Sequence, residues 1–149
     1  MKRYRFGFSK EGLAAFLLAM LPNILWALFP PANDVLSANA AVFPVWEVIA
    51  SLSQWVMIAL LVVLVRADDA PVQRNKAMLR YAAACLVGYY ACWILYYRGI
   101  AGPWLFIAMT VLPTAYFVLA ALWLKNRIAL VPAALFGTIH IALACITYL

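Results

Sequence analysis

Five apolar runs occupy most of this 149-residue chain, and each is about as long as a bilayer core is thick. They cover residues 12–29, 44–65, 79–97, 102–124 and 128–149. Lipid offers no hydrogen-bond partners, so each run must satisfy its own backbone groups, which only a helix does within one segment. The sequence therefore predicts an all-α integral membrane five-helix bundle, built as a single transmembrane domain over residues 1–149.

The composition agrees with a lipid environment. Hydrophobic residues make up 69% of the chain and charged residues 11%, against about 45–50% and about 25% in average soluble domains. The net charge of +6 sits in short clusters between the apolar runs, where orientation signals belong. We therefore expect membrane lipid as a partner and no nucleic acid.

The lysines and arginines predict the orientation. Cytoplasmic loops carry an excess of these residues, and an N-terminus inside leaves only Arg98 on the outer side. The inner side then holds Lys2, Arg3, Arg5, Lys10, Arg66, Arg74, Lys76, Arg80, Lys125 and Arg127. We predict a cytoplasmic N-terminus and an outer C-terminus. Ala38-Asn39-Ala40 fits a signal-peptide cleavage site but lies about ten residues past the first run, so that run is expected to be a permanent span.

The connections carry local signals. Asn33-Asp34 and Ser37 can cap a short helix in the outer loop 30–43. The tight turns at 97–101 and 125–127 predict that spans three, four and five are antiparallel neighbours. Proline at position 22 leaves a carbonyl one turn earlier without its donor, and Asn23 can satisfy it or bind elsewhere.

Several short segments in the first third of the chain resemble an uncharacterised family of small bacterial five-span membrane proteins. They are Gly7-Phe8-Ser9-Lys10, Met20-Leu21-Pro22-Asn23, the loop from Pro31 to Leu36, and the run from Glu47 to Ser51. The resemblance implies a multi-pass protein of the bacterial inner membrane and implies no function.

Polar residues inside spans are costly and are candidates for function. At about 1.5 Å of helix rise per residue, five spans place polar groups about 5–15 Å below the outer boundary. The predicted ligand-binding residues are Asn23, Glu47, Ser51, Gln54, Tyr89, Thr110 and His140. Glu47, Ser51 and Gln54 are spaced to share one helix face. The layer suggests an outward-opening, aromatic-walled pocket.

Each of these residues also has a purely structural interpretation. Arg98 lies at the level of Glu47 and could neutralise it. Asn23, Ser51, Gln54 and Thr110 could be interhelical hydrogen-bond glue. His140 and the tyrosine stripe that includes Tyr89 could serve packing, and Asn33-Asp34 could be a simple turn or cap.

Motifs of enzymes and metal sites are missing from the sequence. There is no H-E-x-x-H, no G-x-S-x-G, no P-loop and no C-x-x-C among the three cysteines. We expect no metal, no cofactor and no catalytic residue. The leading hypothesis is a non-enzymatic, transporter-like or sensor protein that binds a small or lipid-like ligand.

Two alternatives remain open at this point. One is an accessory or assembly subunit whose partner is another membrane protein or a second copy, with Ala82, Ala83, Ala84 and Gly88 at a close helix contact. The other is an intramembrane enzyme that uses Glu47 and His140. The enzyme hypothesis requires both side chains to point into one cavity.

Overall fold

Five long helices dominate the computed structural model, which describes residues 4–38, 43–67 and 74–149. All five are long and apolar enough to cross a membrane. They are α1 (Lys10–Leu28), α3 (Pro44–Val63), α4 (Lys76–Tyr97), α5 (Pro103–Trp123) and α6 (Leu130–Tyr148). The prediction of an all-α structure with five helices of membrane-spanning length is confirmed, with helix ends within three residues of those expected.

Local capping signals set the helix starts. The Ser9 hydroxyl accepts a hydrogen bond from the Gly12 amide at 3.0 Å, so α1 begins at Lys10, ahead of the predicted position 12. Asn75 caps α4 in the same way through the Ala77 amide at 2.9 Å. Pro44 occupies the first position of α3, where a missing N–H leaves no bond unmade.

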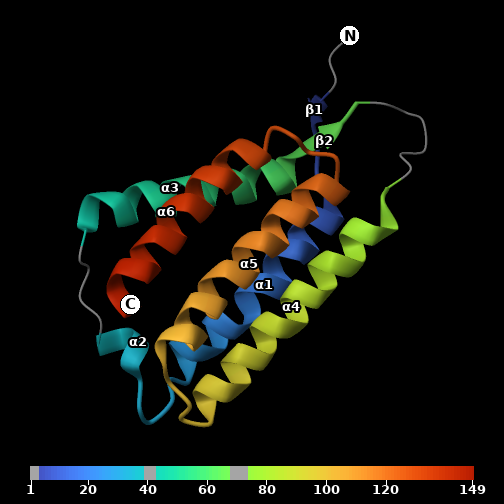
Figure 1. Cartoon of the computed structure of the whole chain (residues 1–149). Coiled ribbons are helices and arrows are strands. Elements are labelled where there is room, and N and C mark those ends of the chain that lie inside the picture. Colours follow the sequence, from blue (N-terminus) through green and yellow to red (C-terminus); the bar gives the residue numbers. More distant parts are fainter. Residues whose placement is uncertain (1–3, 39–42, 68–73) are drawn as a thin grey trace.

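The helices form two groups that diverge along the molecule (Figure 1). One group contains α1, α4 and α5, and the other contains α3 and α6. They meet at the end that holds the turn around Asn126, here called the closed end. They separate toward the short helix α2 (Val35–Ala38), which marks the open end. Two expectations are confirmed: α4, α5 and α6 pack in succession, and the loop after α1 contains a short helix.

Two glycines hold the groups together where they meet. A Cβ on Gly12 of α1 would collide with the backbone carbonyl of Leu61 on α3. A Cβ on Gly137 of α6 would collide with the Thr114 side chain on α5. Both positions therefore need glycine for close helix approach, and both contacts join the two groups.

A two-stranded antiparallel ladder at the closed end was not predicted. Strand β1 (Tyr4–Phe6) pairs with strand β2 (Leu64–Arg66), with Arg5 opposite Val65. The second span therefore stops being helical at Val63, although the apolar run continues to Val65. The ladder forms because α3 ends beside the N-terminal segment. It pairs two segments that are far apart in the sequence.

Side chains of the first strand and of the α5–α6 turn complete the closed end. The Tyr4 hydroxyl donates to the Lys125 carbonyl and accepts from the Arg127 amide, both at 3.2 Å. The buried Asn126 side chain donates to the carbonyls of Leu60 at 2.7 Å and Leu64 at 3.1 Å. The Val62 and Val63 carbonyls at the end of α3 accept instead from the amides of Ser9 at 2.7 Å and Gly7 at 3.0 Å.

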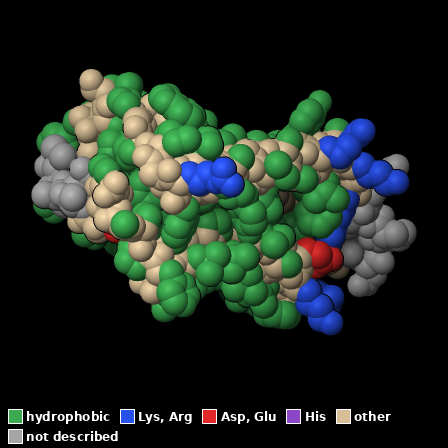
Figure 2. All heavy atoms as spheres, turned by 90° about the horizontal axis from the view of Figure 1, so that it is seen from below, with side chains coloured by type: hydrophobic (Ala, Val, Ile, Leu, Met, Phe, Trp, Pro, Cys, Tyr) green, Lys and Arg blue, Asp and Glu red, His purple; other side chains and the backbone are tan. Residues whose placement is uncertain are grey.

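Basic side chains gather at the closed end. They are Arg5, Lys10, Arg66, Arg74, Lys76, Arg80, Lys125 and Arg127, whereas Arg98 is the one described basic residue at the open end. Figure 2 shows Lys and Arg side chains mainly toward one end of a largely hydrophobic face. Large apolar side chains are exposed on the outside of the bundle, Val45, Val87 and Val131 each by at least 70%. Such a surface suits lipid.

Candidate functional site

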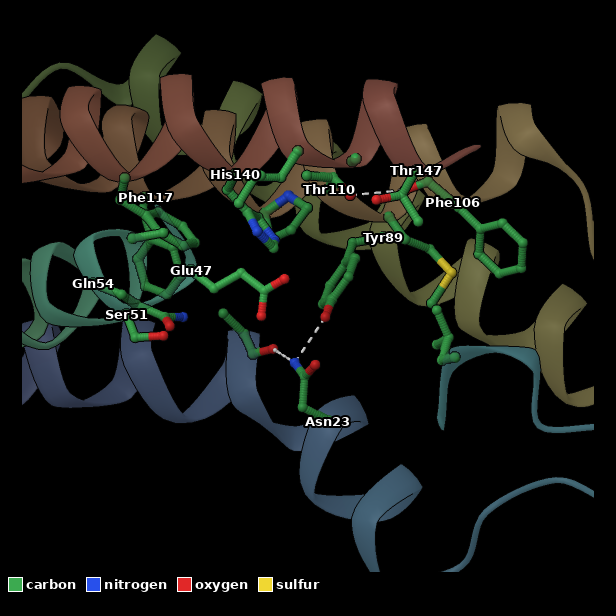
Figure 3. A pocket seen from close by; sticks show the side chains of 18 of the residues that line it. Asn23, Glu47, Ser51, Gln54, Tyr89, Phe106, Thr110, Phe117, His140 and Thr147 are labelled. Atoms are coloured by element: carbon green, nitrogen blue, oxygen red, sulfur yellow. Dashed lines mark hydrogen bonds between the residues drawn. The ribbon is translucent and has the colours of Figure 1, made fainter. Parts of the chain in front are cut away.

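A cavity of about 420 Å³ lies between the two helix groups, in the half of the molecule toward the open end. Each of the five long helices and α2 contributes to its lining. All seven residues singled out in the sequence line it: Asn23, Glu47, Ser51, Gln54, Tyr89, Thr110 and His140. The close-up in Figure 3 shows these side chains converging on one space from different helices.

One face of α3 supplies three of the polar side chains. Glu47, Ser51 and Gln54 all line the cavity, as their spacing predicts. Ser53, between them in sequence, is buried and donates back to the Ile49 carbonyl at 2.8 Å. Within the described ranges the side chains of Glu47, Ser51 and Gln54 form no hydrogen bond or ion pair.

Among the described residues that line the cavity, Glu47 is the one acidic residue. Its carboxylate projects into the space between His140 and Tyr89 (Figure 3). Arg98, which the sequence placed at the same level, forms no ion pair with Glu47. It lies instead at a separate apolar groove of about 350 Å³ between α1 and α4, next to Tyr97 and Ile94. Arg98 does not neutralise Glu47, because the α4–α5 turn directs it to the other side of α4.

Asn23 and Tyr89 form the polar contact between α1 and α4. The Asn23 amide donates to the Tyr89 hydroxyl at 2.8 Å and to the Ala19 carbonyl at 3.3 Å. The carbonyl that Pro22 leaves without an N–H donor is that of Leu18, and it accepts from the Tyr90 hydroxyl at 2.7 Å. Asn23 was expected either to satisfy the carbonyl freed by Pro22 or to bind elsewhere. The structure shows that it binds elsewhere.

The polar residues do not act uniformly as interhelical glue. Asn23 does bond to a neighbouring helix, but the Thr110 hydroxyl donates to Phe106 of its own helix at 2.8 Å. This back-bond satisfies Thr110 and leaves the hydroxyl oxygen able to accept a further bond.

His140 stands in the cavity wall against an aromatic ring. Its imidazole stacks on Phe136, with centroids 4.9 Å apart and planes 20° apart. In the described parts of the chain it makes no hydrogen bond. His140 and Glu47 line the same cavity, which is the condition that the enzyme hypothesis required.

The aromatic lining was expected only in general terms. Phe106, Phe117, Phe136, Trp93 and Tyr148 line the cavity, and Phe106 stacks on Tyr148 with centroids 4.5 Å apart. Sequence reasoning did not single out these residues because an aromatic residue in a core helix gives the same signal. Their depth in the predicted span could have indicated them, since Phe106 lies one helical turn from the predicted site residue Thr110.

Asp34 fixes the loop that borders the open end. One carboxylate oxygen accepts from the Tyr96 hydroxyl at 2.6 Å, the Trp26 indole at 3.0 Å and the Ser37 amide at 3.4 Å. These hydrogen bonds, the one from Tyr96 first, lower the pKa of Asp34 from 3.8 to about 2. The expected role as a cap of the short helix is confirmed, and Asp34 also ties α2 to α4.

Within the described ranges no group of three or more His, Cys, Asp or Glu side chains could hold a metal ion. Comparison of the chain with protein-family models, with curated proteins and with solved structures gave no match. The family resemblance in the first third of the chain therefore remains a prediction. The five helices of membrane-spanning length and the geometry of the cavity are therefore the observations from which a function can be proposed.

Proposed function

We propose that this protein binds a small amphipathic ligand in the cavity between its two helix groups and acts as a transporter-like protein or a sensor. The observation that supports it most strongly is the convergence of polar side chains from all five long helices on one cavity. Its volume of about 420 Å³ falls within the range of about 300–1,000 Å³ typical of small-molecule sites.

The unpartnered polar groups distinguish this proposal from a structural one. A polar group in an apolar medium without a hydrogen bond costs about 2–7 kcal/mol, depending on the reference state. Structural glue would avoid that cost by bonding across helices. The side chains of Glu47, Ser51, Gln54 and His140 form no such bond to the described residues, so water or a ligand must satisfy them.

The proposal includes an orientation and a location. With the closed end in the cytoplasm of a bacterium and the open end outside the inner membrane, eight described basic residues lie inside and Arg98 outside. The cavity then faces the outer half of the membrane. Reporter fusions test this orientation, because the proposal places residue 127 in the cytoplasm and the C-terminus outside.

The accessory-subunit alternative has less support. Ala82 is buried inside the bundle and Gly88 faces Leu112 of α5. Only Ala83 and Ala84 of the proposed contact surface remain exposed. The small residues are therefore divided between internal packing and the outside, which is too little to define a partner surface.

Native mass spectrometry of the detergent-purified protein tests the proposal. Wild type is expected to carry a discrete bound mass, and Asn23→Ala, Glu47→Gln and His140→Ala should each reduce its occupancy. Thr138→Ala is the matched control, because Thr138 is an exposed polar residue of α6 outside the cavity. If the three cavity variants retain the wild-type adducts, the proposed function is wrong.

A further inference from the structure

We propose that the ligand of this cavity is an organic cation, an ammonium-type centre attached to an apolar body, with its charge against Glu47. This inference rests on the proposed function and specifies the ligand class of the same site. It follows from the charge, the hydration requirements and the aromatic lining of the cavity.

The charge of the described cavity lining is negative. Among the described residues, Glu47 is the one acidic side chain in the cavity wall, and no lysine or arginine lines the cavity. The other acid near the open end, Asp34, is occupied by hydrogen bonds from Tyr96, Trp26 and Ser37. The Glu47 side chain is exposed and has no cationic partner among the described residues, so a cationic ligand is the component that can pair with it. An anion would meet repulsion from Glu47 without any compensating cation.

The cation is an organic one and not a hard metal ion. A hard metal ion such as Ca²⁺ requires about six to eight oxygen ligands to replace its water shell. The described residues contain no cluster of three or more acidic, His or Cys side chains that would provide them. An organic ammonium or phosphonium centre requires no shell of six to eight oxygen ligands, so one counter-charge with aromatic surroundings can hold it.

The apolar surroundings are aromatic. In Figure 3 Tyr89 and the Glu47 carboxylate point into the same space, while Phe117 and Phe106 lie to either side of it in the lining of the cavity. Aromatic faces attract organic cations through their quadrupole, within about 6 Å of the ring centroid. The combination of one carboxylate and several rings is how proteins recognise substituted ammonium groups.

This chemistry has two sources in a membrane, a free amphipathic amine and the ethanolamine headgroup of an aminolipid. The cavity is open and lies between helices whose outer faces expose apolar side chains, so the proposal allows either source. The experiment therefore includes an arm for each.

Isothermal titration calorimetry with tetraphenylphosphonium and tetraphenylborate tests the charge preference, because the two ions have nearly the same shape and opposite charge. Wild type should bind the phosphonium, and Glu47→Gln should weaken binding at least tenfold. Glu47→Asp should restore part of it. Glu11→Gln is the matched control, since Glu11 pairs with Arg74 at the closed end. A cooperative thermal unfolding transition of each variant shows that the variant is folded before titration.

The lipid arm uses nanodiscs of phosphatidylglycerol with and without phosphatidylethanolamine. An aminolipid ligand predicts that added phosphatidylethanolamine competes with the phosphonium, whereas a free amine predicts no competition. Both results support an organic cation and identify its source.

Two results would overturn the inference. One is equal phosphonium affinity in wild type and Glu47→Gln, and the other is tetraphenylborate binding as tightly as the phosphonium. If native mass spectra still show a cavity-dependent neutral or anionic ligand in that case, the proposed function stands and only the ligand class is wrong. If native mass spectra also show no discrete ligand, both the ligand class and the proposed function are wrong.

Discussion

The Tyr90 hydroxyl donates a 2.7 Å hydrogen bond to the carbonyl of Leu18, the group that Pro22 leaves without an intrahelical donor. Proline inside a helix removes one backbone hydrogen bond and clashes with the carbonyl one turn earlier. Here a tyrosine of α4 replaces the missing donor. The contact joins α1 to α4 beside the Asn23–Tyr89 bond, so the proline creates an attachment point for the neighbouring helix.

Replacing Tyr90 with Phe should therefore destabilise the protein by about 1–2 kcal/mol, because it leaves the Leu18 carbonyl unsatisfied. In a Pro22→Ala background the restored amide N–H can bond to Leu18, and the same replacement should cost much less. A double-mutant cycle on unfolding free energies measures this coupling. Additive effects of the two changes would show that Tyr90 does not compensate for the proline.

Gly137 gives a prediction about helix approach. Gly137→Ala should cost about 1–3 kcal/mol, since the new methyl group meets the Thr114 side chain between α5 and α6. Thr114→Ser removes the methyl group in the way and should recover much of the loss. Gly88→Ala is the control, because its methyl group would meet only the flexible end of Leu112 at 3.2 Å. Equal losses for the two alanine variants, measured by unfolding in detergent, would contradict this explanation.

Asp34 predicts a dependence of stability on pH. Its pKa is about 2 in the folded protein and 3.8 ordinarily, so folding favours the ionised form. That stabilisation is complete above about pH 4 and is lost as the pH falls toward 2. Asp34→Asn should thus lower the melting temperature at pH 7, with the difference from wild type shrinking below pH 4.

Tyr96→Phe removes the main hydrogen bond to Asp34 and should raise the folded-state pKa of Asp34 toward 3.8. The loss of stability in acid still begins near pH 4, but it should be smaller and should end at a higher pH than in wild type. Melting temperatures of wild type and both variants between pH 2 and 7 provide the check. If the melting temperatures of wild type and Asp34→Asn differ by the same amount at every pH in this range, the ionised Asp34 carboxylate is not the source of the stabilisation.

The helices and much of the cavity lining could be predicted because a membrane simplifies the problem. Each apolar run must be a helix, and helix rise turns a sequence position into a depth. Glu47, Ser51 and Gln54 follow from helical periodicity, while Tyr89, Thr110 and His140 follow from their common depth. These rules placed all of them in one cavity without any knowledge of which helices are neighbours. Ligand binding there remains a proposal.

The features that sequence reasoning missed depend on contacts between distant segments. The pairing of Tyr4–Phe6 with Leu64–Arg66 leaves no local signal, because the second segment continues an apolar helical run. The choice of Tyr90 over Asn23 as the partner of Leu18 depends on the rotation of α4. The position of Arg98, at the groove between α1 and α4 and away from Glu47, depends on the conformation of the α4–α5 turn.

Filling the cavity tests the central claim most directly. Ser51 lines the cavity, and its neighbour Leu52 is 61% exposed on the outside of α3. Native mass spectra should show that Ser51→Trp loses the bound ligand of wild type while Leu52→Trp keeps it, with both variants folded. Retention of the same ligand at the same occupancy in Ser51→Trp would show that it binds elsewhere and would contradict the assignment of this cavity as the binding site.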